Sequence, residues 1–494
     1  MTLDHESRQA YLAARTCWDD VAGAMFTVFG LGKSGIAAAN ALARRGANVL
    51  AVDDKPEAEL AGPLSELDRR VSVQCGGGPA GRRGDLFILS PGVGPHTKRF
   101  HEIQALAHAI LSEVELFYRL DRAAMDGRGH PIAAISGTDG KTTTTLLMGH
   151  LVRQAGLNAV VAGNIGDPLC DFLDTMGPDD VVVAEVSAFQ LVTCSALRPR
   201  VAVVTNIGAD HIDYFAGDTQ AYIDTKLKVA DRMGAGDMLL INGDDPELGP
   251  HRDRLAAGVP FAHAVFTTRG VPARGFGFED GVMWWAPGDG ARVAILPMSE
   301  FGSLGPHPIT GLHNVENALG AVGMALALGI PLDAIRQGLR TFELPAHRMQ
   351  PVGQIGGVRF IDDSKATNPH AAAAGLEAVQ LAPGDRLVWI GGGSEKDADF
   401  AELGELVGRK SAAALLIGQT AQRIAGTLPP HLHVEHCERL EDCVPRGLQL
   451  AQGAGVVLLS PACASYDMFK SYAHRGDVFR LAVAALAQAM AAKT

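Results

Sequence analysis

The chain has 494 residues, of which 47% are hydrophobic and 20% charged, a composition typical of a globular protein with about three domains. Its formal net charge of −12 argues against non-specific binding to nucleic acid or to an anionic membrane, because both interactions need a basic surface. The seven cysteines are scattered and form no C-x-x-C pair, so neither a disulfide framework nor a zinc knuckle is expected. Free thiols, together with the lack of a signal peptide or spanning segment, predict a cytoplasmic protein without membrane insertion.

The first segment predicts a βαβ unit with a nucleotide-binding turn. The apolar run Met25–Phe29 is typical of a buried strand, and GLGKSG at residues 30–35 leads from it into an alanine-rich helix. Further strands are expected at residues 48–52 and 85–89. Glycines allow the backbone to approach a ligand, and a helix N-terminus attracts phosphate. Either NAD, with Asp53 at its ribose, or a nucleotide diphosphate would fit this turn.

The second segment contains a sharper phosphate-binding motif. A strand at residues 131–135 leads into GTDGKTT at residues 137–143, a glycine-rich turn that would present backbone N–H groups to phosphate oxygens. Lys141 would neutralise the β- and γ-phosphates, and the hydroxyl of Thr142 or Thr143 would bind Mg²⁺. The spacing departs from the full Walker A motif, which has glycine where this chain has isoleucine. The flanking strand and helix favour an ATP site over a surface turn with a solvated lysine.

Polar side chains follow two neighbouring strands of the same segment. Glu185 ends the apolar sequence VVVAE, and DHID at residues 210–213 follows a strand expected at residues 201–205. Because parallel strands end at a common edge, these residues would lie beside Lys141, where carboxylate oxygens suit Mg²⁺. On its own, His211 could equally be a capping or core histidine.

Three stretches of this segment have ordinary interpretations. Lys226 falls in a helix expected at residues 219–233, and composition alone predicts an exposed helical lysine. The stretch at residues 250–308 is rich in glycine, proline and short apolar runs, which predicts a small β insertion within the central domain. The apolar stretch at residues 318–332 is too short to cross a bilayer and predicts a core helix.

The third segment again alternates apolar strands with helices, and the chain ends in an amphipathic helix at residues 477–491. Three polar loops follow its strands and predict a ligand crevice at one sheet edge. Cys463 has no evident basic partner and is expected to be a packed thiol. The strands are expected at residues 358–361, 387–390, 414–417 and 456–459, and the loops are DSKATN (363–368), GGGSEK (391–396) and SPACAS (460–465).

The predicted fold class is therefore α/β with three domains. Residues 1–126 would form an N-terminal Rossmann-like domain, and residues 127–343 a central P-loop ATPase-type parallel sheet with the β insertion. Residues 344–494 would form a C-terminal Rossmann-like α/β domain.

The motifs occur in a set order that resembles the Mur ligases over residues 26 to 480, and DSKATN together with SPACAS is typical of the glutamate-adding branch. The resemblance implies a first domain for a UDP-linked substrate, a central ATPase domain, and a last domain that closes over ATP and receives glutamate. It therefore favours UDP over NAD at the first glycine turn. The motifs are GLGKSG, SPGV, GTDGKTTTT, GNIG, EVSAFQL, NIGADHID, GLHNVENAL, LPAHRM, IDDSKATN and SPACAS.

The resemblance also implies which residues bind each substrate. The UDP end would contact Gly30, Leu31, Asp54, Lys55 and Ser90. The muramoyl-alanine end would lie near Asn164 and His211, and glutamate near Lys365, Thr367, Lys396, Ser465 and Tyr472. ATP would contact Gly137, Thr138, Asp139, Gly140, Lys141, Thr142 and Thr143, with Asn314 and Asn317 at the adenine, Arg348 at phosphate and Asp363 at the ribose.

The implied metal site has two Mg²⁺ ions, with Thr142, Glu185, His211 and Lys226 as ligands. Lys226 stands fifteen residues after His211, as does the family's carbamylated lysine, so addition of CO₂ would make it N6-carboxylysine, an anionic metal ligand. Catalysis would depend on Lys141, Glu185, His211 and Lys226.

Three positions depart from the family's usual residues. Asp139 replaces the common asparagine and adds negative charge near phosphate, and Ala188 replaces a common serine. Tyr472 stands where phenylalanine is usual and could alter how glutamate is oriented.

The activity that the resemblance implies is ATP-dependent addition of D-glutamate to UDP-N-acetylmuramoyl-L-alanine through an acyl phosphate, with release of ADP and phosphate, in peptidoglycan precursor synthesis. The chain is expected to act as a monomer. Three alternatives remain open: a related ligase for L-glutamate, another amino acid or a folate-type glutamate tail; an NAD-dependent oxidoreductase; and a nucleotide-binding regulator without catalysis.

Overall fold

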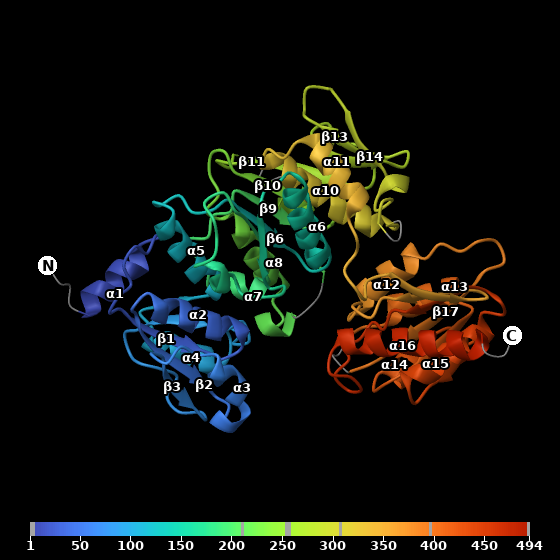
Figure 1. Cartoon of the computed structure of the whole chain (residues 1–494), viewed down its shortest axis with the longest axis horizontal. Coiled ribbons are helices and arrows are strands. Elements are labelled where there is room, and N and C mark those ends of the chain that lie inside the picture. The colour runs from blue at the N-terminus through green and yellow to red at the C-terminus, as the bar shows by residue number, and fades with distance from the viewer. Residues whose placement is uncertain (1–4, 209–211, 252–257, 306–308, 395–397, 492–494) are drawn as a thin grey trace. The chain divides into compact units, whose positions relative to one another are not determined.

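The computed structural model describes residues 5–208, 212–251, 258–305, 309–394 and 398–491 (Figure 1). The chain divides into two compact units, one made of Met1–Pro297 with Val315–Leu339 and the other of Met298–Asn314 with Arg340–Thr494. Two sheets lie in the first unit and one in the second, and parallel pairings dominate all three, so the predicted α/β class is confirmed. The domain boundaries after residues 126 and 343 stay predictions. In the described ranges, no helix is long and apolar enough to cross a bilayer.

The first sheet has five parallel strands. The chain runs outward from the central strand through two neighbours and then returns to the other side of that strand. In a parallel sheet, such a reversal separates the loops at the carboxyl ends and leaves a crevice where ligands bind. The strands, in spatial order, are β3 (Ser72–Cys75), β2 (Asn48–Asp53), β1 (Met25–Phe29), β4 (Leu86–Leu89) and β5 (Ala109–Leu111).

The central sheet has nine strands and includes the β-rich segment after residue 250. That segment is continuous with the sheet, because two of its strands extend the parallel pairing and only the last two are antiparallel. The strands, in spatial order, are β14 (Val293–Pro297), β13 (Val282–Ala286), β12 (Gly275–Glu279), β11 (Ala262–Thr267), β10 (Met238–Asn242), β9 (Val201–Val204), β6 (Ile132–Ser136), β8 (Val181–Glu185) and β7 (Ala159–Gly163).

The third sheet forms the core of the second unit. Its first strand is antiparallel to its neighbour and the remaining pairs are parallel. The strands, in spatial order, are β15 (Gln350–Ile355), β16 (Gly357–Asp362), β20 (Ala454–Leu459), β17 (Arg386–Gly391), β18 (Ala413–Leu416) and β19 (His433–His436).

Helices connect the parallel strands, and several begin at side-chain caps that satisfy free backbone N–H groups. Ser112, Asp218 and Asn368 each accept a hydrogen bond from the third residue after them. The described helices are α1 (His5–Ala14), α2 (Lys33–Arg44), α3 (Ala61–Ser65), α4 (Lys98–Leu106), α5 (Glu113–Ala124), α6 (Lys141–Gln154), α7 (Ala188–Leu191), α8 (Thr219–Leu227), α10 (Leu312–Ala327), α11 (Leu332–Thr341), α12 (Pro369–Ala378), α13 (Ala401–Lys410), α14 (Ala421–Ala425), α15 (Leu440–Leu450) and α16 (Tyr472–Ala491).

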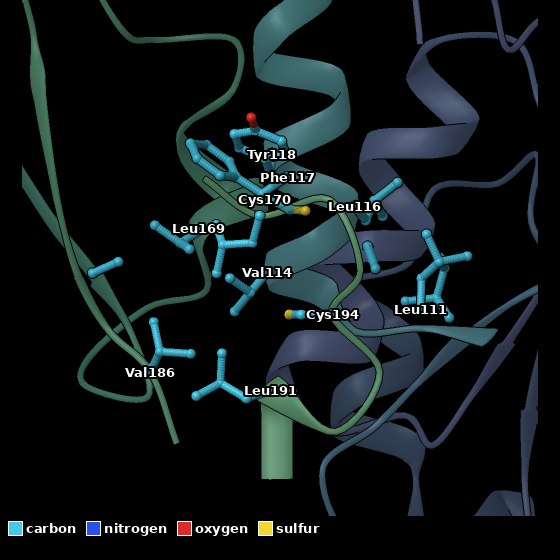
Figure 2. Packing of buried hydrophobic residues seen from close by; sticks show 14 of the residues in the cluster. Leu111, Val114, Leu116, Phe117, Tyr118, Leu169, Cys170, Val186, Leu191 and Cys194 are labelled. Carbon is cyan, nitrogen blue, oxygen red and sulfur yellow. The ribbon is translucent and has the colours of Figure 1, made fainter. Parts of the chain in front are cut away.

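One cluster of buried apolar side chains connects the first and central sheets. Helix α5, which follows the last strand of the first sheet, supplies several of its members. Figure 2 shows Phe117 of this helix near Cys170, which belongs to the 3₁₀-helix η2 (Leu169–Phe172), and Val114 of the same helix between Cys170 and Leu191 of α7. Burial of such side chains is the main favourable term in folding, so this cluster stabilises the whole first unit.

Glu113 lies at the start of α5 and its carboxyl group is buried beside this cluster. One oxygen, Oε1, accepts a hydrogen bond from the backbone N–H of Cys170 at 2.7 Å. The other, Oε2, has no hydrogen-bond partner in the described part of the chain. Burial raises the pKa of Glu113 to about 7, although the bond from Cys170 opposes that rise.

Replacing Glu113 by glutamine is therefore expected to make the first unit's stability less dependent on pH. The pKa of Glu113 is higher in the folded chain than the ordinary 4.5, so its stabilising contribution is complete below pH 4.5 and is lost as the pH rises through 7. The loss would amount to about 3 kcal/mol. In urea unfolding at pH 5, 6.5 and 8, the free energy of unfolding of Glu113→Gln should increase relative to that of the wild type as the pH rises.

Glu405→Gln is the matched control, because that side chain is 79% exposed on α13. Its stability difference from wild type should not change with pH. A Glu113→Gln difference that is equally flat would show that Glu113 titrates normally.

Candidate active site

The loop between β6 and α6 has the conformation that its glycines predict. Gly137 and Gly140 have φ angles of +136° and +79°, which residues with side chains rarely adopt. A Cβ on Gly137 would collide with Thr205 Oγ1, and a Cβ on Gly140 would collide with Asn317 Oδ1. Both positions therefore require glycine, and the loop packs closely against its neighbours.

The end of β9 fixes this loop in place. Asn206 Oδ1 accepts hydrogen bonds from the backbone N–H groups of Thr138 at 3.2 Å and Asp139 at 2.8 Å. Thr205 Oγ1 donates to the carbonyl of Asp139 at 2.6 Å. These bonds set the backbone of the loop before any ligand binds, which lowers the ordering cost of binding.

The residues that open α6 present a cation and hydroxyl groups beside the loop. Lys141 is half-buried, and its Nζ donates to the carbonyl of Thr138 at 2.6 Å. Thr142 is half-buried and Thr143 is buried, and Thr143 Oγ1 has no hydrogen-bond partner among the described residues. The first intrahelical bond joins Thr144 N to Gly140 O, and the N–H groups of the first turn of α6, which have no acceptor within a helix, suit an anion.

Glu185 lies at the carboxyl end of β8, next to the strand that precedes the loop. Asn164 Nδ2 donates to Glu185 Oε1 at 2.9 Å. Glu185 Oε2 is buried and has no hydrogen-bond partner within the described ranges. An unpaired buried carboxylate oxygen is costly, and a divalent cation would compensate it, so this side chain fits a Mg²⁺ ligand.

The other expected metal ligands are only partly described. No three His, Cys, Asp or Glu side chains of the described residues gather as a metal site, and His211 lies outside those residues.

Lys226 is buried beside the phosphate loop, contrary to what composition alone predicts. Its exposed fraction is 3%, and its Nζ donates to the carbonyl of Gly137 at 2.6 Å. The same Nζ lies 4.5 Å from the centroid of the Tyr222 ring. Tyr222 in turn shares a hydrogen bond of 3.0 Å with Thr138 Oγ1. Helix α8 thus contacts the loop through two side chains one turn apart.

The two asparagines of α10 fall in different units. Asn317 belongs to the first unit and packs against Gly140, and its Oδ1 accepts from Thr144 Oγ1 at 3.4 Å. Asn314 belongs to the second unit, and its Nδ2 donates to Thr310 O at 2.7 Å. Asn314 Oδ1 is buried without a partner in the described chain.

The glycine turn of the first sheet lies where the strand order reverses, between β1 and β4. Gly30 has a φ of +93°, and a Cβ there would approach the Cβ of Ser90 to 2.5 Å. The carboxylate of Asp53 accepts from Leu31 N at 2.7 Å and from Lys55 N at 2.9 Å. Asp53 therefore stabilises the turn itself, and the Lys55 side chain stays exposed.

Asp54 forms an ion pair with Arg99 of α4, which also pairs with Glu102 at 2.7 Å. The Arg99 guanidinium lies 5.4 Å from the centroid of the Phe29 ring, at the end of β1. A hollow of about 730 Å³ opens beside Arg99 between α4 and residues 77–80. Arg99 was not among the predicted residues, because nothing local marks its partner 45 residues away.

In the second unit, Asp363 follows β16 and is bonded on both oxygens. Ser460 Oγ donates to Oδ2 at 2.7 Å, and Met349 N donates to Oδ1 at 3.2 Å. Burial raises the pKa of Asp363 to about 7, opposed by Ser460 and by the nearby Arg348. Arg348 lines a cavity of about 640 Å³ in this unit.

Of the residues predicted to contact glutamate, Lys365, Thr367 and Ser465 lie in loops of the same unit, and Tyr472 begins α16. Lys365 Nζ is 5.5 Å from the centroid of the Tyr472 ring, and this tyrosine is 36% exposed. Ser465 is buried and Thr367 is half-buried. Lys396 lies outside the described residues.

Comparison with known proteins identifies the family. A family model described as the Mur ligase middle domain matches residues 135–325, and one described as the Mur ligase glutamate ligase domain matches residues 347–463. A protein of Pelotomaculum thermopropionicum named UDP-N-acetylmuramoylalanine--D-glutamate ligase is 38% identical over 464 residues, covering 93% of this chain and 97% of that protein. The chain belongs to the Mur ligase family.

Further comparisons agree with this Mur ligase assignment. A protein of the same name from Caldanaerobacter subterraneus is 36% identical, with 92% of this chain and 97% of that protein covered. The solved structure of UDP-N-acetylmuramate-alanine ligase MurC from Thermotoga maritima matches with a TM-score of 0.56 at 16% identity, covering 95% of this chain and 99% of that chain. At that identity the match shows the fold alone. The predicted family is confirmed, and the comparisons give no support to an NAD-dependent oxidoreductase.

Two residues that fix the phosphate loop were assigned no role from the sequence: Thr205, and Asn206 at the start of the motif NIGADHID. In the second unit, Arg475 lies in none of the motifs and contacts two of the loops that follow the third sheet. Asn206 could have been found, because it is a polar residue directly after an apolar strand. The roles assigned to individual residues stay predictions.

Proposed function

We propose that this Mur ligase uses ATP to join D-glutamate to the carboxylate of UDP-N-acetylmuramoyl-L-alanine. The observation that carries the proposal is that Lys141 and Lys226 both donate to one preformed loop between β6 and α6, with Glu185 at the end of the neighbouring strand β8. The close relatives bear the name of that ligase. In the wider family, this loop supports activation of a carboxylate by phosphoryl transfer from ATP.

In the first step, a carboxylate oxygen of the UDP-linked substrate would form a bond to the γ-phosphorus of ATP, and the bond from that phosphorus to ADP would break. Lys141 and the N–H groups at the start of α6 would offset the repulsion between the approaching anions. In the second step, the amine of glutamate would attack the acyl carbon, lose a proton and displace phosphate. The chain's role is to position and neutralise, and no covalent enzyme intermediate is needed.

Two Mg²⁺ ions are part of this proposal, with Thr142, Glu185, His211 and Lys226 as the protein ligands. The unpaired, buried Oε2 of Glu185 supports the first of these assignments. Bound there, Mg²⁺ would supply positive charge against the phosphate oxygens.

Lys226 is proposed to act as N6-carboxylysine. Its neutral amine would attack CO₂, forming a C–N bond and losing a proton, and the product would carry a carboxylate. The burial of Lys226 at the first glycine of the phosphate loop supports this assignment, because a carboxylate beside that loop would be of the kind that holds Mg²⁺.

The remaining assignments are also proposals. The UDP end would bind at the switch point of the first sheet, which Gly30 and Ser90 line. Glutamate would bind at the loops that carry Lys365, Thr367 and Ser465. The seven free cysteines and the need for ATP favour the cytoplasm, and the protein would act as a monomer.

The decisive experiment measures phosphate release from ATP in the presence of UDP-N-acetylmuramoyl-L-alanine and one amino acid at a time. D-glutamate, L-glutamate, L-alanine, L-lysine and diaminopimelate are tested in parallel, with Mg²⁺ throughout. Release that depends on D-glutamate is expected. No release with D-glutamate, together with strong release for another amino acid, would overturn the substrate assignment.

A further inference from the structure

Arg475, near the start of α16, carries a guanidinium group that is fully buried. Its Nε donates to Ser364 Oγ at 2.9 Å, and its Nη2 donates to the carbonyls of Ser364 at 2.8 Å and Cys463 at 3.0 Å. Its Nη1 donates to Ala464 O at 3.3 Å. One side chain thus bonds to the loop after β16 and to the loop after β20.

The loop after β17 meets the same group. A Cβ on Gly393 would collide with Ala464 O and would lie 3.1 Å from Arg475 Nη1, so a residue without a side chain fits best between that carbonyl and the guanidinium. The neighbouring Ser394 donates its backbone N–H to Ala464 O at 2.9 Å, an oxygen that Arg475 also contacts. The guanidinium therefore lies where the three polar loops of the third sheet come together.

The charge of Arg475 has no ion-pair partner within 4 Å in the described part of the chain. Burial lowers the pKa of Arg475 to about 10, and the charges of Asp467, Asp362 and Asp363 oppose that fall, so the group stays charged at neutral pH. A buried cation bonded to carbonyls and a hydroxyl is costly compared with an apolar side chain of the same length. Stability alone does not account for arginine at this position.

The guanidinium of arginine is better suited than the ammonium of lysine to bonding two loops at once. Four N–H groups of one planar guanidinium reach acceptors on two loops at once, which a single ammonium on a flexible stem cannot do. Ser364 extends the arrangement, because its Oγ donates to the carbonyl of Tyr472 at 2.8 Å while it accepts from Arg475. The exposed Tyr472 is thereby tied to the same loops.

The nucleotide side of this unit is anchored separately. Asp363, the expected ribose contact, is fixed by Ser460 and by the backbone of Met349, and neither bond involves Arg475. Loss of the Arg475 fork would therefore loosen the loops of Lys365, Thr367 and Ser465 while leaving the carboxylate of Asp363 in place.

We propose that Arg475 is the positioning residue that assembles the amino-acid-binding loops of this Mur ligase. The proposal rests on the assigned amide-ligase function. It makes Arg475 a residue that acts through Ser364, Cys463 and Ala464 and not one that touches the reacting atoms.

The test compares Arg475→Lys, which keeps the charge but loses the fork, with Arg475→Met and with Arg480→Lys. Arg480 is on the same helix, is half-exposed and pairs with Asp477 at 3.2 Å, so it is the matched control. The KM for the amino acid should rise about tenfold or more in Arg475→Lys. The KM for ATP in Arg475→Lys should stay within about twofold of wild type. In Arg480→Lys, the KM for the amino acid and the KM for ATP should both stay within that range.

Wild-type protein identifies the amino acid first, from the same panel of five. Should none of them support phosphate release, the assigned function fails, and the positioning role is then judged by amide hydrogen exchange alone. Exchange at residues 364–368 and 462–466 should be faster in Arg475→Lys than in Arg480→Lys, whatever the activity. Equal exchange, an unchanged amino-acid KM, or equal rises of the two KM values in folded Arg475→Lys would overturn the proposal. Arg475→Met shows the additional effect of removing the charge. If Arg475→Met does not fold, Arg475→Lys alone decides the test.

Discussion

Replacing Lys141 by alanine is expected to lower ADP formation by about 10²–10³-fold or more. The side chain opens helix α6 directly after Gly140, and its Nζ already lies 2.6 Å from the carbonyl of Thr138 in the phosphate loop. Phosphoryl transfer crowds anions together, and catalysis of such reactions comes mainly from positioning and from neutralising charge. The loop itself should persist in the variant, because Asn206 and Thr205 fix it independently of Lys141.

The measurement is ADP release with the UDP-linked substrate and amino acid saturating, alongside the thermal unfolding midpoint. Lys141→Arg should recover only part of the rate, because a planar guanidinium replaces a compact ammonium. Lys410→Ala is the control: this lysine lies at the end of α13 and pairs with Glu377 at 2.7 Å. Wild-type rates in a folded Lys141→Ala protein would mean that the loop does not bind the transferred phosphate, and would favour a regulatory nucleotide site.

The sequence predicts the central strands of each sheet well and the edge strands poorly. Central strands such as β4 and β6 are buried along their whole length, so they appear in the sequence as continuous apolar runs. Edge strands such as β3 and β19 contain no fully buried residue, and their sequences SVQC and HVEH carry no such run. Their strand conformation comes from pairing with a neighbour that is distant in sequence.

The same limit applies to individual site residues. The glycine turns could be recognised because a turn, a strand end and a helix start are all local features. The burial of Lys226 could not be recognised from the local sequence, because its partner Gly137 lies 89 residues earlier. Arg475 was placed outside the final helix, which begins at Tyr472, and its partner Ser364 lies 111 residues away. Resemblance to the family supplied Lys226 where composition pointed the other way, and supplied nothing for Arg475.

Replacing Lys226 by alanine is expected to lower ligase activity by about 10²-fold or more. The side chain is 3% exposed and its Nζ donates to Gly137 O, so its removal empties a buried position at the phosphate loop. Two chemical roles are consistent with that position. A carbamate would place a carboxylate there as a metal ligand, whereas an ammonium would stabilise the loop carbonyl and interact with the Tyr222 ring.

Small molecules added to Lys226→Ala distinguish these roles. Formate, acetate or propionate should partly restore activity if the lysine works as a carbamate, because each supplies a carboxylate that fits the vacated space. Methylamine or ethylamine should restore it if the ammonium is what matters. Lys228→Ala is the matched control, since that lysine follows closely in the chain and donates to Val192 O at 2.8 Å, away from the loop. Rescue by amines and not by acids, or full activity in the unsupplemented variant, would end the carbamate assignment. Rescue by acids alone would support carboxylation, because an added carboxylate, and not an added amine, would then have replaced the group that Lys226 supplies.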